Sequence, residues 1–420
     1  MRIRTVVKKD SLLIYELSMN CRHGSCYFFF SQWRRICGTI GFVTVRTADR
    51  IYISMEKTSM PDENNINHRR RPHYSGKYPK HFNEKYKELN PEKYDGMAEH
   101  VIEKGSTPAG THIPIMVEEV LEHLSVKSGE NGCDCTLGYG GHSKKILEAL
   151  NGSGHLVSLD VDPEESDKTE KRLRDAGFGP KLFSVEHINF AEVKSAAEKY
   201  GKFDFLMADL GVSSMQIDNP ARGFSYKLDG PLDLRMNQSR GETAAERLKE
   251  LDAEEIEGML VENADEPNAA EIAAKIVEYR RKRKPLETTA DLRNLIEEAL
   301  PKSLVEKKSG EGSISETAYK EALKKADARV FQALRIDING EYEALEALLI
   351  ALPDVMKPGG RIVFLTFHSG EDRLVKRAFK EGKKAGYYSE IAEDVIRPSA
   401  EECRRNPRAR STKLRWAIRD

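Results

Sequence analysis

Short apolar runs alternate with helical patterns between residues 115 and 209. Four runs read as strands, at 132–138, 155–160, 182–185 and 203–209, and stretches with helical spacing lie between them. The run at 203–209 is apolar almost throughout, which is typical of a strand buried on both faces. Strands that alternate with helices predict an α/β fold with a mostly parallel, doubly wound sheet.

The alternation stops after about residue 241. Apolar positions then recur at helical spacing through 242–328 without an intervening strand, which predicts an inserted all-helical domain. A long helix at 338–352, a strand at 361–367, a helix at 373–382 and a closing strand at 413–419 complete the sheet. The predicted domains are an extension (1–60), an arm (61–110), the first part of the α/β domain (111–241), the helical insertion (242–328) and a second part with a basic tail (329–420).

The first 54 residues differ from the rest in charge. They hold nine Lys and Arg against three acids, a bias that an organelle transit peptide would have. An upstream extension without a folded role, with the true start at Met55 or Met60, is the favoured interpretation. The arm interleaves tyrosines with basic residues and suits nucleic acid with unstacked bases. A solvated arm whose aromatic side chains pack on its own domain is an equal alternative.

The net charge of -1, from 67 basic and 68 acidic residues, argues against a protein that coats a polyanion along its whole length. The charges are nevertheless segregated, because residues 69–93 carry +5, residues 397–420 carry +5 and residues 242–327 carry -6. The six cysteines include no C-x-x-C pair, so we expect no zinc or other metal site and a reducing compartment. No apolar run reaches the ~18–20 residues of a membrane span.

A glycine turn follows the first predicted strand. Gly138 and Gly140 fit the first two positions of a dinucleotide-binding turn, and Ser143 stands in the third. Asp160 ends the next strand, where an acid can accept hydrogen bonds from both ribose hydroxyls, although it could also cap a helix. Together they predict a nucleoside-containing ligand, either NAD or S-adenosylmethionine, and the glycines do not decide between the two.

Three further motifs lie at predicted strand ends and in the tail. They are Asp209-Leu-Gly-Val-Ser-Ser-Met-Gln216, Pro358-Gly-Gly-Arg-Ile-Val-Phe-Leu-Thr-Phe-His368-Ser-Gly-Glu371 and Asn406-Pro-Arg-Ala-Arg-Ser-Thr-Lys413. With these motifs, the chain from about residue 112 to 419 resembles the MraW/RsmH family of ribosomal RNA (cytosine-N4)-methyltransferases. The resemblance implies a class I methyltransferase (Rossmann-like) fold with an inserted helical domain, S-adenosylmethionine as methyl donor, and a cytidine in the decoding region of small-subunit ribosomal RNA as acceptor.

The resemblance also implies roles for individual residues. It places Gly140, Gly141 and His142 against the donor, Asp160 on the ribose, Phe190 near the adenine, and Asp209 and Gln216 beside the donor. Asp209 is the candidate catalytic residue, either for the acceptor amine or only for the donor. The candidate RNA contacts are Arg222, Phe224, Arg235, Arg335, His368, Arg373, Arg408, Arg410, Lys413 and Arg415. For any single arginine the alternative is a surface ion pair. His368 could also be a general base, although a structural hydrogen-bonding histidine is the favoured interpretation.

Three departures and several open alternatives accompany the resemblance. Cys135 and Gly370 stand where the family usually has a small residue and a leucine, and the extension before His112 is longer than the family's usual start. No Pro-Cys pair is present in the Asp209 loop, which argues against C5 methylation through a thiolate adduct. An assembly factor that keeps the fold without catalysis is the alternative function. The expected partner is ribosomal RNA in an assembled 30S-type subunit, without a membrane; the oligomeric state is open, a homodimer included. We expect a bacterial cytoplasm, or a plastid or mitochondrial matrix if residues 1–54 are a transit peptide.

Overall fold

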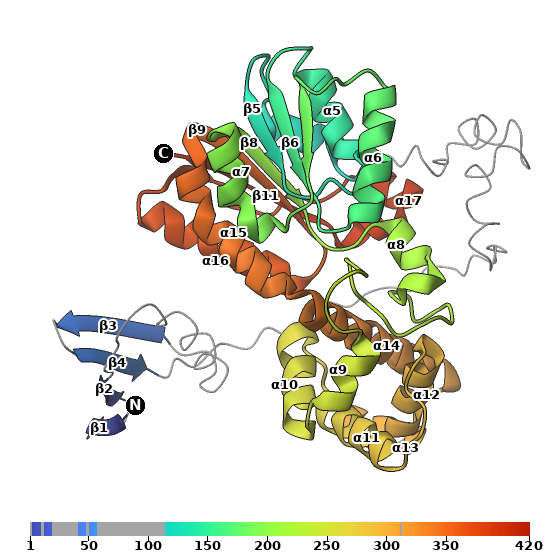
Figure 1. Ribbon diagram of the computed structural model, residues 1–420. Helices are drawn as coiled ribbons and strands as arrows, with labels where there is room; N and C mark the ends of the chain where they lie inside the picture. The colour runs from blue at the N-terminus through green and yellow to red at the C-terminus, as the bar shows by residue number, and fades with distance from the viewer. Residues whose placement is uncertain (1, 10–11, 19–40, 48–49, 57–113, 311–312) are drawn as a thin grey trace, which may run out of the picture. The chain divides into compact units, whose positions relative to one another are not determined.

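A computed structural model describes residues 2–9, 12–18, 41–47, 50–56, 114–310 and 313–420 (Figure 1). The chain divides into two compact units, residues 1–76 and 77–420, which are described separately. The basic arm predicted at 61–110 lies outside the described residues. Within the described ranges, no helix is long and apolar enough to cross a membrane.

The first unit contains a four-stranded antiparallel sheet. Its strands are β1 (Arg2–Lys9), β2 (Leu12–Ser18), β3 (Gly41–Thr47) and β4 (Arg50–Glu56), in the order β1-β2-β4-β3. The sequence led us to expect an extension without a folded role, and that expectation included no strands.

The second unit is built on a seven-stranded sheet in the order β10-β11-β9-β8-β5-β6-β7. The strands β5 (Asn131–Asp134), β6 (His155–Leu159), β7 (Phe183–Glu186), β8 (Phe203–Asp209) and β9 (Met356–Thr366) are parallel. The strand β11 (Lys413–Arg419) is antiparallel to both β9 and β10 (Tyr388–Ile391). The chain leaves the central strand β5 toward β6 and returns on its other side with β8, so the topological switch point lies at β5. The Rossmann-like prediction is confirmed; β10 was not predicted.

Both faces of this sheet are covered by helices. One core cluster joins it to α4 (Val117–Leu124), α5 (Gly141–Ala149) and α6 (Pro163–Asp175), and another joins it to α7 (Val193–Tyr200), α15 (Glu341–Val355) and α16 (Ser369–Lys384). Residues of β8 alternate between the clusters, since Phe205 and Met207 pack on one side and Leu206 and Ala208 on the other. This burial on both faces explains why the strand is apolar almost throughout.

Helices fill the connection between β8 and β9. After the short helix α8 (Ser214–Asp218) come α9 (Ala244–Glu250), α10 (Ala253–Ala264), α11 (Ala269–Arg281), α12 (Thr289–Ala299), α13 (Lys302–Ser309) and α14 (Glu316–Asn339). Their common core runs from Phe224 to Leu334, wider than the 242–328 that the sequence suggested, because the segment before α9 packs into it.

The predicted start of the helix at 338–352 is wrong. Gly340 adopts a left-handed backbone conformation with φ 57° and ends α14, and α15 begins at the next residue. This break turns the chain from the insertion back onto the sheet. It brings Asn339 and Glu341, on either side of the glycine, to the carboxyl ends of the strands, where both line the cavity described below.

Candidate active site

A cavity of about 610 Å³ lies at the carboxyl ends of β5, β6, β8 and β9, next to the switch point. This is where open α/β sheets bind their ligands, and the volume is that of a small-molecule site. Four strand ends contribute to its wall, through the turn after β5, Asp160 after β6, Asp209 at the end of β8 and Phe367 after β9. Segments 407–411 and 335–345 complete the wall.

The turn after β5 is held by two acids. The Asp134 carboxylate accepts hydrogen bonds from the backbone N–H of Thr136 (3.0 Å) and the hydroxyl of Ser143 (2.6 Å). The Asp160 carboxylate accepts from the backbone N–H of Gly138 (2.7 Å) and of Asp162 (2.8 Å). Ser143 at the third position of the motif therefore binds the strand end, which a glycine could not do. Burial raises the pKa of Asp160 to about 6, against the lowering effect of the two N–H groups.

The glycines of the turn differ in what they do. Gly140 has φ 71°, and a Cβ atom on it would lie 2.6 Å from the Cγ2 atom of Thr169 on α6. It contacts α6 and is not among the residues that line the cavity, whereas Gly141 and His142 are. Gly140 therefore permits the turn and its close approach to α6, and Gly141 starts α5 at the cavity wall.

Asp209 presents a carboxylate to the cavity. Its backbone N–H donates to the Thr136 hydroxyl (2.7 Å), and its Oδ2 atom lies 3.7 Å from Nε2 of His142. Its Oδ1 atom is buried and has no hydrogen-bond partner in the described part of the chain. Burial raises the pKa of Asp209 to about 8, and the carboxylates of Asp134 and Glu371 add to the shift.

Gln216 and Phe190 also line the cavity. Gln216 lies in the first turn of α8, where its Oε1 atom accepts from the N–H of Ser213 (2.9 Å) and its Nε2 group donates to Asp162 (3.0 Å). Phe190 opens a 3₁₀ turn (Phe190–Glu192) after β7 and packs partly buried against the core. An apolar ring and an acid on neighbouring strand ends form a surface that suits a nucleoside.

The structure distributes the ten predicted RNA contacts among three environments. Arg335, Arg408 and Arg410 line the cavity. Arg373 is exposed at the start of α16, 3.9 Å from Asp265. The other six either make internal contacts or are buried away from the cavity wall. They are Arg222, Phe224, Arg235, His368, Lys413 and Arg415.

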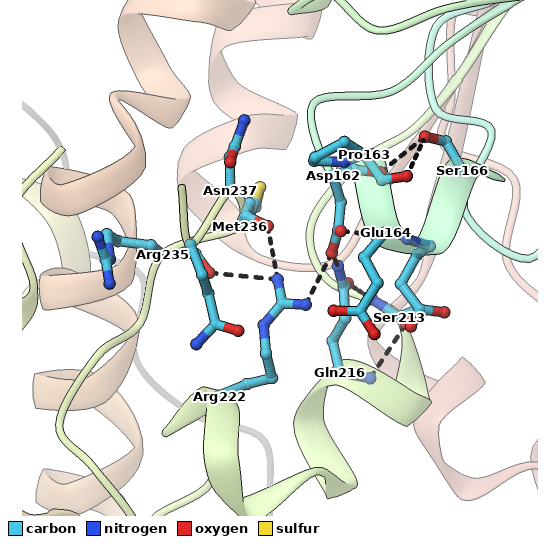
Figure 2. A network of polar contacts seen from close by, with 12 residues as sticks. Asp162, Pro163, Glu164, Ser166, Ser213, Gln216, Arg222, Arg235, Met236 and Asn237 are labelled. Atoms are coloured by element: carbon cyan, nitrogen blue, oxygen red, sulfur yellow. Dashed lines mark hydrogen bonds and ion pairs between the residues drawn. The ribbon is translucent and has the colours of Figure 1, made fainter. Parts of the chain in front are cut away.

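Arg222 is the clearest case of an internal contact (Figure 2). Its guanidinium lies 2.8 Å from the Asp162 carboxylate and donates to the carbonyl of Met236 (2.5 Å). Its side chain is 6% exposed and that of Asp162 is 4% exposed. Arg235 binds the Asp233 carboxylate through two nitrogens, at 2.7 and 2.9 Å. Both arginines therefore fix the segment that leads into the insertion.

Two carboxylates in the cavity wall escaped the sequence reasoning. Glu341 binds Arg335 through two hydrogen bonds (2.7 and 2.8 Å). Glu371 accepts from the N–H of Phe367 (2.8 Å) and lies 3.0 Å from Nε2 of His368. Burial raises the pKa of Glu371, but His368 and Arg335 outweigh it and hold the pKa below its usual range. The place of Glu371 just after a strand adjacent to β8 was the signal that could have revealed it.

His368 contacts Glu371 but is not among the residues that line the cavity. Its ring, that of Tyr342 (centroids 5.9 Å apart) and the Glu371 carboxylate lie together. Glu341, His368 and Glu371 offer ligand atoms within 4.8 Å of one another, a spacing that a metal ion could use. The guanidinium of Arg335 already supplies positive charge to both carboxylates at this place.

Comparison with known proteins identifies the family. A family model described as "MraW methylase family" matches residues 109–420. "Ribosomal RNA small subunit methyltransferase H 1" of Agathobacter rectalis is 55% identical over 84% of this chain and 98% of its own length, and its namesake in Lachnoclostridium phytofermentans is 54% identical over 86% and 96%. "Ribosomal RNA small subunit methyltransferase H 2" of Alkaliphilus metalliredigens is 48% identical over 85% and 99%. The family model matches most of the chain, and the glycine turn, Asp160 and Asp209 lie around one cavity. The chain therefore belongs to the MraW methylase family of S-adenosylmethionine-dependent methyltransferases.

Proposed function

We propose that this protein transfers a methyl group from S-adenosylmethionine to the exocyclic N4 amine of a cytidine in the decoding region of small-subunit ribosomal RNA. The observation that carries the proposal is the Asp209 carboxylate, which lines the cavity at the end of β8 and whose Oδ1 atom has no hydrogen-bond partner among the described residues. The relatives named small-subunit ribosomal RNA methyltransferases supply the class of acceptor.

The donor half of the cavity fits a nucleoside. Asp160 is held by two backbone N–H groups and keeps lone pairs for ribose hydroxyls, while Phe190 offers a ring to the adenine. Gly141 and His142 approach the same space from the start of α5. S-adenosylmethionine, when bound, supplies an activated methyl group on a sulfonium. The acidic wall of the cavity suits that positive charge.

We assign Asp209 to the acceptor amine. The cytosine N4 amine is conjugated with the ring, so its lone pair is a poor nucleophile. Once ionised, a carboxylate of raised pKa is a stronger base. It accepts a hydrogen bond from the amine, which increases the electron density of the nitrogen, and it then holds the proton that the amine loses as the N–C bond forms and the methyl–sulfur bond of the donor breaks. Orientation of the two reactants lowers the activation barrier further, because proximity is worth roughly 7–11 kcal/mol in well-aligned cases.

A cytidine must leave its stack to reach this cavity, which looped RNA permits more easily than a duplex. Arg408 and Arg410 lie in the wall segment 407–411, and Arg335 lies in the wall segment 335–345. We assign Arg410 to the RNA backbone, since its exposed side chain has no ion pair within the described residues. We further propose that the substrate is an assembled small subunit in a bacterial cytoplasm.

The test combines a strain that lacks the gene with the purified protein. Mass spectrometry of small-subunit RNA from the strain that lacks the gene should show one cytidine without an N4 methyl group. Purified protein with labelled donor should restore that group. Asp209→Asn should bind S-adenosylhomocysteine in calorimetry but transfer methyl at least a hundredfold more slowly, as loss of general-base catalysis does. Unlabelled subunits after incubation with wild-type protein would favour an assembly factor without catalysis.

A further inference from the structure

The solvent-facing side of α16 is strongly basic. Its exposed charged residues are six cations and one acid, namely Arg373, Lys376, Arg377, Lys380, Lys383, Lys384 and Glu381. We call the six cations the α16 basic face. The helix begins three residues after β9, and it lies beside α15 in Figure 1. The sequence reasoning singled out only its first member, Arg373.

The fold does not require this charge pattern. The opposite side of α16 supplies its packing, through Val375 and Phe379 in the core against Phe364 and Tyr388. Along the exposed side, Lys376 and Lys380 are four residues apart, and each has further cations at three or four residues. Like charges at this spacing destabilise a helix. Lysines in the last turn favour the helix dipole, but cations in the first half do not.

Acidic neighbours neutralise little of this face. Arg377 lies 3.1 Å from Glu346 and Arg373 lies 3.9 Å from Asp265, and all four side chains are well exposed, where such pairs contribute little. Lys376, Lys380, Lys383 and Lys384 form no ion pair in the part of the chain that the structure describes.

The acid at the head of the helix is also neutralised. Asp372 binds Lys413 (2.9 Å) and Arg415 (2.6 Å) of β11. The two tail cations that the sequence offered as phosphate contacts thus compensate Asp372, so Asp372 does not neutralise the α16 basic face.

The face starts next to the candidate active site. Glu371, in the first turn of the same helix, lines the cavity, and Arg373 follows two residues later. From Arg373 to Lys384 the helix advances about 16 Å, at 1.5 Å per residue. The cations therefore form a track that leads away from the cavity wall.

We propose that the α16 basic face binds the phosphate backbone of the RNA strand whose base enters the cavity. The proposal rests on the proposed function for the identity of the RNA. An anionic membrane would be attracted by the same charge, but a helix that lies in a membrane surface needs an apolar face for the lipid. The apolar face of α16 is buried against the sheet.

The test replaces Lys376, Lys380 and Lys383 by glutamine in the full-length protein. Binding to a decoding-region RNA hairpin is measured from 50 to 300 mM salt. We expect affinity at low salt to fall roughly tenfold or more, and the slope of log K against log salt to fall by about 0.7 for each phosphate that the variant no longer neutralises. Affinity for S-adenosylhomocysteine should stay unchanged, which checks that the variant is folded.

A matched control carries the same change in charge elsewhere. Lys171, Lys181 and Lys202 are exposed, and the last two precede β7 and β8, at the edge of the sheet opposite to the cavity. The triple glutamine variant of these lysines should keep the wild-type RNA affinity and slope. An equal fall in affinity in both triple variants, or an unchanged affinity in the α16 variant, would overturn the proposal.

Two further outcomes separate the proposals from each other and from a membrane role. If the wild-type protein methylates RNA and the α16 variant binds RNA with normal affinity, only the basic-face proposal is refuted. Wild-type protein that transfers no methyl group but binds RNA through α16 refutes only the proposed function. If the α16 variant loses the binding of the wild-type protein to phosphatidylglycerol vesicles but keeps its RNA binding, the face binds lipid instead.

Discussion

The guanidinium of Arg222 and the carboxylate of Asp162 form an ion pair at 2.8 Å, and both side chains are almost completely buried. Asp162 follows β6 by three residues and donates its N–H to Asp160. Arg222 also holds the carbonyl of Met236, whose own N–H donates to Asn339 at the end of α14 (2.7 Å). One chain of polar contacts thus joins Asp160, just after β6, to the helical insertion, and Figure 2 shows its middle part from Asp162 through Arg222 to Met236.

Removing the arginine from this pair should destabilise the protein. Arg222→Ala leaves a buried carboxylate without its charge partner, and such changes cost about 3–5 kcal/mol in the free energy of unfolding. Urea denaturation measures the loss. Arg281→Ala, at an exposed position at the end of α11, serves as control and should change stability by less than about 0.5 kcal/mol. A loss below about 1 kcal/mol for Arg222→Ala would contradict the structural role.

The stability contributed by Asp209 should fall as pH rises. An unfolded Asp titrates near pH 4, whereas burial raises the pKa of Asp209 to about 8 in the folded protein. Between these values the folded state binds the extra proton, so each step upward in pH favours unfolding. Asn cannot titrate, and Asp209→Asn should therefore gain stability relative to wild type between pH 5 and pH 8.

Urea denaturation of both proteins at the two pH values measures this gain. Asp160, whose pKa burial raises to about 6, is present in both proteins, so its contribution cancels in the difference. A difference between wild type and variant that is the same at pH 5 and at pH 8 would show that the carboxyl group of Asp209 titrates normally.

Gly370 and Tyr342 should behave as a compensating pair. A Cβ atom at position 370 would lie 1.9 Å from the Tyr342 hydroxyl oxygen, which donates to the carbonyl of Asn263 (3.1 Å). The tyrosine thus fills the space that a leucine side chain at 370 would need. Gly370→Ala should cost about 1–3 kcal/mol through overpacking. Combining Gly370→Ala with Tyr342→Ala should recover part of the loss.

A double-mutant cycle measures that recovery as a coupling energy, expected at about 0.5–3 kcal/mol for residues in contact. Gly258→Ala is the matched control, because a Cβ atom there meets nothing within 4 Å in the helix α10. It should raise stability by up to about 1 kcal/mol through helix propensity. Additive losses at positions 342 and 370 would show that the tyrosine moves aside.

The strands and the acids at their ends could be predicted because both are local signals. An apolar run ending in Asp209 or Asp160 specifies a buried strand and the side chain at its carboxyl end. The environment of an arginine is not local. Arg222 finds its partner 60 residues earlier and Arg415 finds Asp372 43 residues earlier, so a motif rich in arginine cannot separate an ion pair from a phosphate contact.

The limits of the helices depended on backbone conformation more than on hydrophobicity. Apolar residues continue at helical spacing across Gly340, and only its positive φ separates α14 from α15. The same kind of pattern predicted α16 only as a helix at 373–382. Its basic face became distinct once the structure showed that Lys413 and Arg415 are used on Asp372.

Arg410 and Arg415 should separate RNA binding from stability within one tail. Arg410 is exposed and lines the cavity, whereas Arg415 is 5% exposed and pairs with Asp372 at 2.6 Å. Arg410→Gln should reduce the salt slope of RNA binding by about 0.7 and leave the unfolding free energy within about 0.5 kcal/mol of wild type. Arg415→Gln should lower that free energy by about 2 kcal/mol, as loss of a charged hydrogen bond does, and leave the slope unchanged. Salt titration and urea denaturation of both variants measure the two effects, and a smaller slope for Arg415→Gln would return that residue to the RNA interface.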